Sequence, residues 1–216
     1  MDRIQLLILF KISMNIVLIN PEYPSKSGRG HGGIATYVYT MANALCNAGH
    51  RVHVLVREGT IINDKNMKIR YHEFDNSPIR SSLSFLSRRL NGDIYWEKGC
   101  SKAALELILK LHEKSTVDIV EIPEYQGLAS QFYRPLPFPV VINFHTPTVL
   151  IDNLNNAKLS FEKYKWYSYE KKAIRNGTAY KCPSHSLTNK LKSFYSILSE
   201  QVAVIKNPIE PDDYNS

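Results

Sequence analysis

Cysteine is scarce in this sequence: only Cys46, Cys100 and Cys182 occur among 216 residues, and they lie far apart. An odd, widely spaced set supports neither a disulfide framework nor a zinc site, and it favours a reducing, cytoplasmic location. Several enzyme motifs are also missing, namely the H-E-x-x-H metal motif, the G-x-S-x-G nucleophile and the P-loop lysine. Since the histidines are not spaced as metal ligands either, we expect no metal.

A long hydrophobic run is absent as well. Residues 4–10 are apolar except for Gln5, but this run is too short to span a bilayer and no small-residue cleavage site follows it. We interpret residues 1–13 as an N-terminal extension. The remainder shows no internal repeat or low-complexity tract, and it is long enough for one large α/β domain or two small ones.

Acidic residues are too few to balance the basic ones, and the formal net charge is +7. The segment from Lys158 to Lys192 holds nine basic and two acidic residues, so it accounts for the whole excess. Charge runs on helices are most often solvated faces. The second interpretation is contact with anionic lipid headgroups, which suits basic helices with interspersed aromatics. No recognition module supports nucleic acid as a partner.

The clearest structural signal lies between residues 14 and 56. Residues 14–20 form an apolar run of strand length that stops at Pro21. A helix with one apolar face follows, marked by Ile34, Val38, Met41 and Leu45. Gly49 ends this helix, and residues 51–56 read as a second strand. A βαβ unit of this kind predicts two neighbouring parallel strands with a right-handed crossover.

The rest of the chain repeats this alternation. Further strands are expected at residues 67–74, 117–122, 139–144, 178–182 and 202–206. Helices are expected at residues 102–114 behind a Ser101 cap, at 157–175, and from Ser184 to about residue 197, whereas 76–100 reads as a loop with a helical piece. The pattern predicts a Rossmann-like α/β three-layer sandwich with a mainly parallel sheet over residues 14–206. Residues 207–216 read as a linker.

The glycines between the first strand and its helix are the first candidate site. Gly28, Gly30 and Gly33 match G-x-G-x-x-G, but residues 21–27 separate them from the strand and no acid ends the second strand cleanly. Nicotinamide binding is therefore disfavoured. We favour a loop that ends in Gly32-Gly33 and leaves room for a large phosphorylated ligand at a helix N-terminus. The alternative is that these glycines only allow the chain to turn.

Two further candidates follow strands at the same predicted sheet edge. His145 comes directly after the strand at 139–144, beside a stiffening proline, and we expect it to face a ligand. Glu121 and Tyr125 lie where the preceding strand ends, with Glu124 between them. General acid–base catalysis by these carboxylates is one interpretation. Hydrogen bonding to substrate hydroxyls is the simpler one.

Taken in order, these pieces resemble the N-terminal domain of family 4 retaining glycosyltransferases, which have the GT-B fold. The matching segments are MNIVLIN at 14–20, HGGIATYV at 31–38, LCNAGHRVHVLV at 45–56, DIVE at 118–121, NFHT at 143–146, residues 170–184 and VIKNP at 204–208. Each piece is weak alone, but their order and spacing over residues 14–210 make the match specific.

The resemblance implies transfer of a sugar from a nucleotide-sugar donor to a glycan, lipid-linked or small-molecule acceptor, with no cofactor. It implies that Gly32 and Gly33 approach the donor diphosphate and that His145, the catalytic candidate, reaches the donor sugar. It places the acceptor against the loops that carry Glu22, Tyr23, Arg29, Glu121, Tyr125 and Thr146. The metal-binding Asp-x-Asp signature of the other major class of sugar-nucleotide transferases is absent.

The sequence departs from the family in one respect. Family members carry a second domain that binds the donor, and no segment of this sequence resembles it, so we expect this chain alone to be catalytically incomplete. A non-catalytic carbohydrate- or lipid-binding module is the alternative, and a nicotinamide-dependent sugar oxidoreductase or epimerase is the third interpretation. Peripheral contact with the inner face of a membrane through Lys158–Lys192 is a further expectation.

Overall fold

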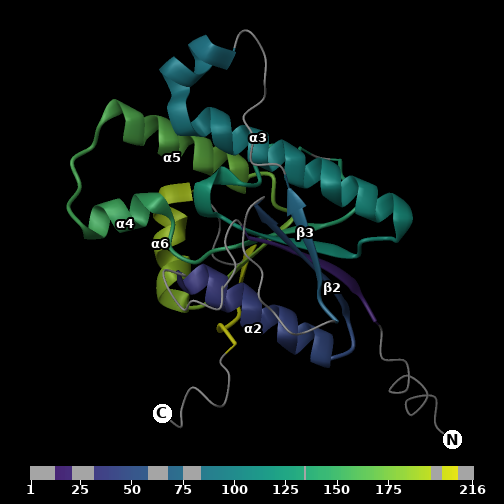
Figure 1. Cartoon of the computed structure of the whole chain (residues 1–216). Coiled ribbons are helices and arrows are strands. Elements are labelled where there is room, and N and C mark those ends of the chain that lie inside the picture. Colours follow the sequence, from purple (N-terminus) through teal and green to yellow (C-terminus); the bar gives the residue numbers. More distant parts are fainter. Residues whose placement is uncertain are drawn as a thin grey trace, which may run out of the picture.

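The computed structural model describes residues 13–20, 32–57, 68–74, 84–133, 135–195 and 201–208, with the backbone alone for residues 84–93. Its centre is a seven-stranded sheet in the order β3-β2-β1-β4-β5-β6-β7, and every neighbouring pair is parallel (Figure 1). The strands are β1 (Asn15–Ile19), β2 (Arg51–Arg57), β3 (Arg70–Phe74), β4 (Ile119–Pro123), β5 (Val140–Asn143), β6 (Ala179–Cys182) and β7 (Val202–Val204).

Helices cover both faces of this sheet. They are α2 (Gly33–Asn47), α3 (Ser84–Lys114), α4 (Thr148–Leu154), α5 (Phe161–Ile174) and α6 (His185–Tyr195), with a short 3-10 turn, η1, at Tyr125–Gly127. In Figure 1, α2 lies on one side of the sheet, and α3 and α5 lie on the other. The predicted three-layer, Rossmann-like sandwich with a parallel sheet is confirmed.

Strand β1 shows how the sequence produces these layers. All five of its residues are buried, as expected of a central strand in a parallel sheet. Ile16 and Leu18 pack with Val38 of α2, whereas Val17 and Ile19 belong to the larger core beneath α3, α5 and α6. Because successive side chains point to opposite faces, a single apolar strand supplies both cores.

The structure corrects the prediction of a loop with only a helical piece at residues 76–100, of which residues 84–100 are described. Helix α3 is continuous from Ser84 to Lys114, so Ser101 lies inside it and is not an N-cap. The side chain of Ser101 is fully buried; its hydroxyl donates to the Leu128 carbonyl at 2.6 Å and accepts from the Gln131 amide at 3.0 Å. The polar residue that resembled a cap serves a tertiary contact instead.

The predicted helix at 157–175 is also too long at its start. Helix α5 begins at Phe161, because the Ser160 hydroxyl accepts the Lys163 amide and caps the helix there. The short helix α4, which the sequence did not predict, precedes it. The predicted cap at Ser184 is confirmed, since its hydroxyl accepts the Leu187 amide at 3.2 Å.

Candidate functional site

Polar side chains from four elements converge at the carboxyl edge of the sheet. Tyr37 comes from the second turn of α2, Glu121 from β4, Asn143 from the end of β5 and Lys181 from β6. Because these strands are parallel and adjacent, their carboxyl ends meet at one edge. Three of these residues (Tyr37, Asn143 and Lys181) have less than a tenth of their surface exposed.

Hydrogen bonds join these side chains into one network, here called the Glu121 network. Lys181 Nζ lies 2.7 Å from Glu121 Oε2 and also donates to the Tyr37 hydroxyl. Tyr37 in turn donates to Glu121 Oε1 at 2.7 Å, and the Asn143 amide donates to the same oxygen at 2.9 Å. The positive and negative charges compensate each other, which a buried ion pair needs to be tolerated.

The environment keeps Tyr37 protonated. Burial and then the charge of Glu121 raise the pKa of the Tyr37 hydroxyl far above its usual value. The hydroxyl therefore stays a donor to Glu121 at every physiological pH, and both oxygens of Glu121 are engaged within the protein.

His145 lies directly against this network. Its ring meets the Tyr37 ring edge-on, with 4.9 Å between the centroids. Burial, followed by the positive charge of Lys181, lowers the pKa of His145 to about 4. The imidazole is therefore neutral near pH 7, and it can both donate and accept a hydrogen bond.

The start of α2 provides a second component of the site. Gly32 is the N-cap residue, no side chain of the described residues caps the helix, and its first turn contains no acidic residue. Gly32 and Gly33 are exposed, and a Cβ added to either would meet no atom within 4 Å. Helix N-termini attract anions through their free N–H groups and the helix dipole. This end of α2 therefore suits a phosphate group.

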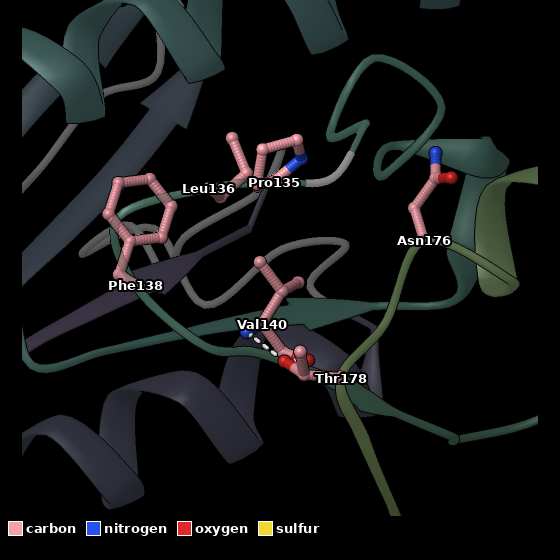
Figure 2. Close-up of a pocket in the computed structure, with 6 residues that line it drawn as sticks. All are labelled: Pro135, Leu136, Phe138, Val140, Asn176 and Thr178. Carbon is pink, nitrogen blue, oxygen red and sulfur yellow. Dashed lines mark hydrogen bonds between the residues drawn. The ribbon is translucent and has the colours of Figure 1, made fainter.

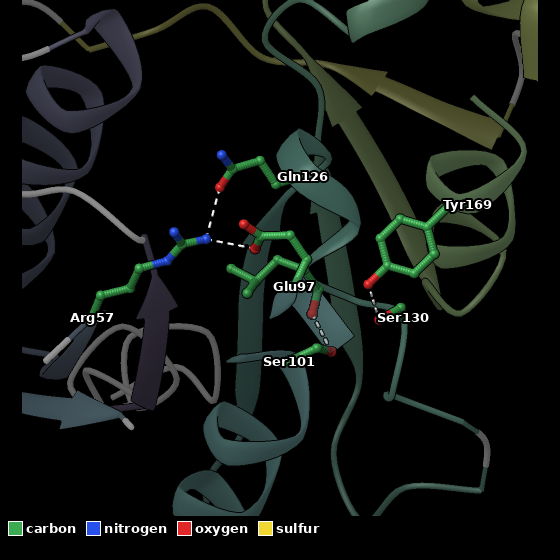
Figure 3. Close-up of polar contacts among 7 residues, drawn as sticks. Arg57, Glu97, Ser101, Gln126, Ser130 and Tyr169 are labelled. Atoms are coloured by element: carbon green, nitrogen blue, oxygen red, sulfur yellow. Dashed lines mark hydrogen bonds and ion pairs between the residues drawn. The ribbon is translucent and has the colours of Figure 1, made fainter. Parts of the chain in front are cut away.

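A second polar cluster fixes the η1 turn beside the site (Figure 3). Arg57, at the end of β2, forms an ion pair with Glu97 of α3 and donates to the Gln126 side chain at 2.8 Å. Gln126 has a positive φ of 56°, which is uncommon for a residue with a side chain. On the other side, the hydroxyls of Ser130 and Tyr169 lie 2.7 Å apart. The turn that follows β4 is thus held from β2, α3 and α5.

A pocket of about 380 Å³ lies at the opposite edge of the sheet (Figure 2). Its lining is mostly apolar and consists of Pro135, Leu136, Phe138, Val140, Asn176 and Thr178. Val140 begins β5 and Thr178 precedes β6, so this pocket opens at the amino edge, away from His145. The described residues that line it include no titratable side chain, and we assign it no chemistry.

The sequence profile of Glycosyltransferase Family 4 matches residues 31–213, which is most of the chain. The chain belongs to glycosyltransferase family 4. No curated protein sequence matches it significantly.

Solved structures agree with this family assignment at the level of the fold. The catalytic domain of Starch Synthase IV from Arabidopsis thaliana, bound to ADP and acarbose, is similar with a TM-score of 0.64 and 17% identity, over 94% of this chain and 53% of that one. A glycosyltransferase from Rickettsia africae ESF-5 is similar with a TM-score of 0.54 and 16% identity, over 94% of this chain and 48% of that one. Os79 from O. sativa, in complex with UDP, is similar with a TM-score of 0.54 and 11% identity, over 93% of this chain and 53% of that one.

This family 4 chain spans about half the length of those structures. Its fold is that of one half of a GT-B glycosyltransferase, as the resemblance predicted. Among the described residues, no cluster of three or more His, Cys, Asp or Glu side chains could hold a metal ion.

The structure brings most of the predicted site residues to one edge. Gly32 and Gly33 begin the helix that carries Tyr37, Glu121 is part of the network, and His145 packs on the Tyr37 ring. Tyr125 begins η1, and Thr146 is exposed next to His145. Glu22, Tyr23 and Arg29, with Gly28 and Gly30, lie outside the described residues. The individual roles assigned to these residues stay predictions.

Three residues of the site escaped the sequence analysis, namely Tyr37, Asn143 and Lys181. Lys181 could have been found from the sequence. It lies inside a short predicted strand, and a lysine buried there needs a partner of opposite charge. Tyr37 gave none, because a tyrosine on an apolar helix face looks like a core residue.

Proposed function

We propose that this chain is the acceptor-side half of a retaining glycosyltransferase that uses a nucleotide-sugar donor. The acceptor would be a glycan, a lipid-linked sugar or a small molecule. The observation that carries the proposal is the uncapped start of α2, exposed at Gly32-Gly33, in the same helix whose Tyr37 packs against His145. Family membership supports it, and so do the ADP and UDP named with similar structures.

The arrangement suits sugar transfer for a physical reason. As the bond between the sugar and the diphosphate breaks, negative charge develops on the departing phosphate oxygens. Backbone N–H groups at the start of α2 would stabilise that charge, and preorganised donors of this kind are worth about 10²–10³ in rate. The neutral His145 would hydrogen-bond to a sugar hydroxyl, while the Glu121 network fixes the Tyr37 ring against which His145 packs.

The described contacts disfavour the nicotinamide alternative. A cationic side chain at the end of β2 could hold the 2′-phosphate of such a cofactor. Arg57 stands at this place, but it is paired with Glu97 and Gln126 and has only 19% of its side chain exposed. The non-catalytic binding module remains the alternative, because one wall of a cleft can bind a sugar without transferring it.

Nucleotide binding at α2 can be tested with amide NMR spectra of the full chain. We expect UDP or ADP to shift the Gly32 and Gly33 amide signals and NADH to leave them in place. Gly33→Asp should weaken this binding about tenfold, because a carboxylate there repels the diphosphate. Gly33→Ala is the matched control, since a Cβ fits there freely. Tight NADH binding, or equal affinities for the two variants, would refute the assignment.

We also propose that the hairpin formed by α4 and α5, residues 148–174, contacts the cytoplasmic face of a membrane. Five of the seven large exposed hydrophobic side chains among the described residues lie on it. They are Ile151, Leu154, Leu159, Phe161 and Tyr164. Lys158 lies among them, and Lys165 Nζ lies 5.1 Å from the Phe161 ring centroid. Apolar side chains within a basic surface are typical of binding to anionic lipid. No described helix is long and apolar enough to cross the bilayer.

Vesicle flotation would test this contact. The chain should bind vesicles containing phosphatidylserine, and binding should weaken steeply with salt because exposed charges are screened within about 8 Å at physiological ionic strength. Tyr164→Ser should reduce binding, whereas Tyr133→Ser, which changes an equally exposed tyrosine outside the hairpin, should not. Binding that does not depend on lipid charge or on salt would mean that the basic segment is only a solvated surface.

A further inference from the structure

Two buried carboxyl groups lie beneath the loop that carries His145. Glu124, next to the η1 turn, is 3% exposed, and Glu170 of α5 is fully buried. Neither forms an ion pair among the described residues, which is unusual for buried glutamates. Both are engaged instead with the two loops at the carboxyl edge of the sheet.

Glu124 holds the first part of the His145 loop. Its Oε1 accepts the His145 backbone N–H at 3.0 Å, and the nearby Thr146 backbone N–H also favours the charged form of this carboxyl group. The Glu124 backbone N–H donates to the Asn143 carbonyl at 3.2 Å. The turn after β4 and the loop after β5 are thus joined through this one residue.

Glu170 holds the other end of the same loop. Its Oε1 accepts the Thr148 hydroxyl at 2.6 Å and the Trp166 indole N–H at 3.2 Å. The backbone N–H groups of Thr148 and Gln126 also lie close to this carboxyl group and favour its charged form. It therefore connects α5 to both the His145 loop and the strained η1 turn.

We propose that Glu124 and Glu170 are a pair of positioning residues that hold His145 against Tyr37 and the donor site. Together they hold residues 145, 146 and 148 from below, while His145 itself faces the Glu121 network. The role of His145 in this proposal rests on the proposed function. The coupling between the two carboxyl groups and the loop does not.

The second oxygen of each carboxyl group explains how the pair would respond to pH. Glu124 Oε2, Glu170 Oε2 and the Tyr195 hydroxyl are all buried and have no hydrogen-bond partner among the described residues. Burial raises the pKa of Glu124 to about 8, and the charge of Glu170 adds to this rise. Burial also raises the pKa of Glu170 to about 7, so the pair retains at least one proton near neutrality.

Among the described residues, the titratable groups around the pair would not neutralise a second negative charge. Tyr195 faces it from α6, and burial, followed by the charges of Glu170, Glu124 and Tyr167, raises the pKa of the Tyr195 hydroxyl, which therefore stays neutral. His145 is neutral, and Lys181 is already paired with Glu121. Both pKa values are higher in the folded chain than in the unfolded one. The folded state is therefore favoured most below about pH 4.5, and this contribution is lost as pH rises through 7 and 8.

NMR signals of the full chain report on both carboxyl groups without any assay of activity. The Trp166 indole N–H donates to Glu170, so its signal should shift with an inflection near pH 7. Glu170→Gln should abolish this inflection and lower the pH at which Glu124 titrates. Glu162→Gln, an exposed glutamate in the first turn of α5, is the matched control and should leave the titration unchanged.

The His145 ring signals then test positioning itself. Glu124→Ala should shift them at every pH, whereas Glu124→Gln, which keeps an oxygen that can accept the His145 N–H, should restore them and remove their dependence on pH between 7 and 9. Circular dichroism identifies a variant that has failed to fold. If Glu124→Ala does not fold, the Gln variants alone test the proposal. Unchanged His145 signals in Glu124→Ala, or a Trp166 signal without an inflection in the parent chain, would overturn the proposal. Absence of sugar transfer would affect only the proposed function.

Discussion

Replacing Lys181 by methionine should destabilise the chain by about 3–5 kcal/mol, the usual cost of removing one partner from a buried ion pair. The reason is the position of Glu121, whose carboxyl group would be left in a mostly buried site without its cationic partner, with Tyr37 and Asn143 as its hydrogen-bond donors among the described residues. Methionine has similar length, so the loss would reflect charge more than volume. The free energy of unfolding, measured in urea, checks this.

A double-mutant cycle separates the pair from its surroundings. Glu121→Gln removes the negative charge, so adding it to Lys181→Met should recover about 0.5–3 kcal/mol relative to the sum of the single changes. Lys102→Met is the control, because Lys102 and Glu106 form an exposed pair at 3.7 Å whose loss should cost less than about 1 kcal/mol. Equal losses for the two lysines would show that the Glu121 network contributes little.

The first half of the fold could be predicted because its signals are local. Residues 14–56 contain an apolar strand, a helix with one apolar face and a glycine stop, and Gly49 indeed adopts a positive φ of 94°. The continuous helix α3 could not be predicted, because Gly99 and Ser101 both discourage a helix and only contacts with distant segments overcome them.

The site shows the same division between local and distant information. Gly33 and His145 could be placed at the carboxyl edge of the sheet from the order of strands, because Gly33 begins a helix and His145 follows a strand. The sequence predicts Glu121 where its strand ends, but it lies in the middle of β4. The Glu121 network does not follow, since Lys181 and Tyr37 are 144 residues apart in the chain. Likewise Glu170 reads as one more charge on a basic helix, and only the packing of α5 shows that it is buried.

The 216-residue chain alone is expected to transfer no sugar from donor to acceptor. It spans about half of the structures it resembles, and its described residues provide only one wall around the start of α2. One wall leaves the departing diphosphate in water, where each hydrogen bond and charge stabilises it far less than in an enclosed site. Adding the donor-binding half of a GT-B enzyme as a separate polypeptide should restore transfer, if the two halves can associate.

In that combined enzyme, His145→Ala should lower turnover by about 10²–10³-fold, the usual loss when one preorganised donor is removed. The acceptor KM should change much less, because the exposed Thr146 and the η1 turn are held by Glu124 and Glu170 rather than by the imidazole. His50→Ala is the matched control: it also removes an imidazole, but His50 precedes β2 at the far edge of the sheet and contacts Met14. Radiolabelled sugar transfer measures both variants. Transfer by the isolated chain, or equal losses for the two histidines, would mean that the catalytic centre lies elsewhere.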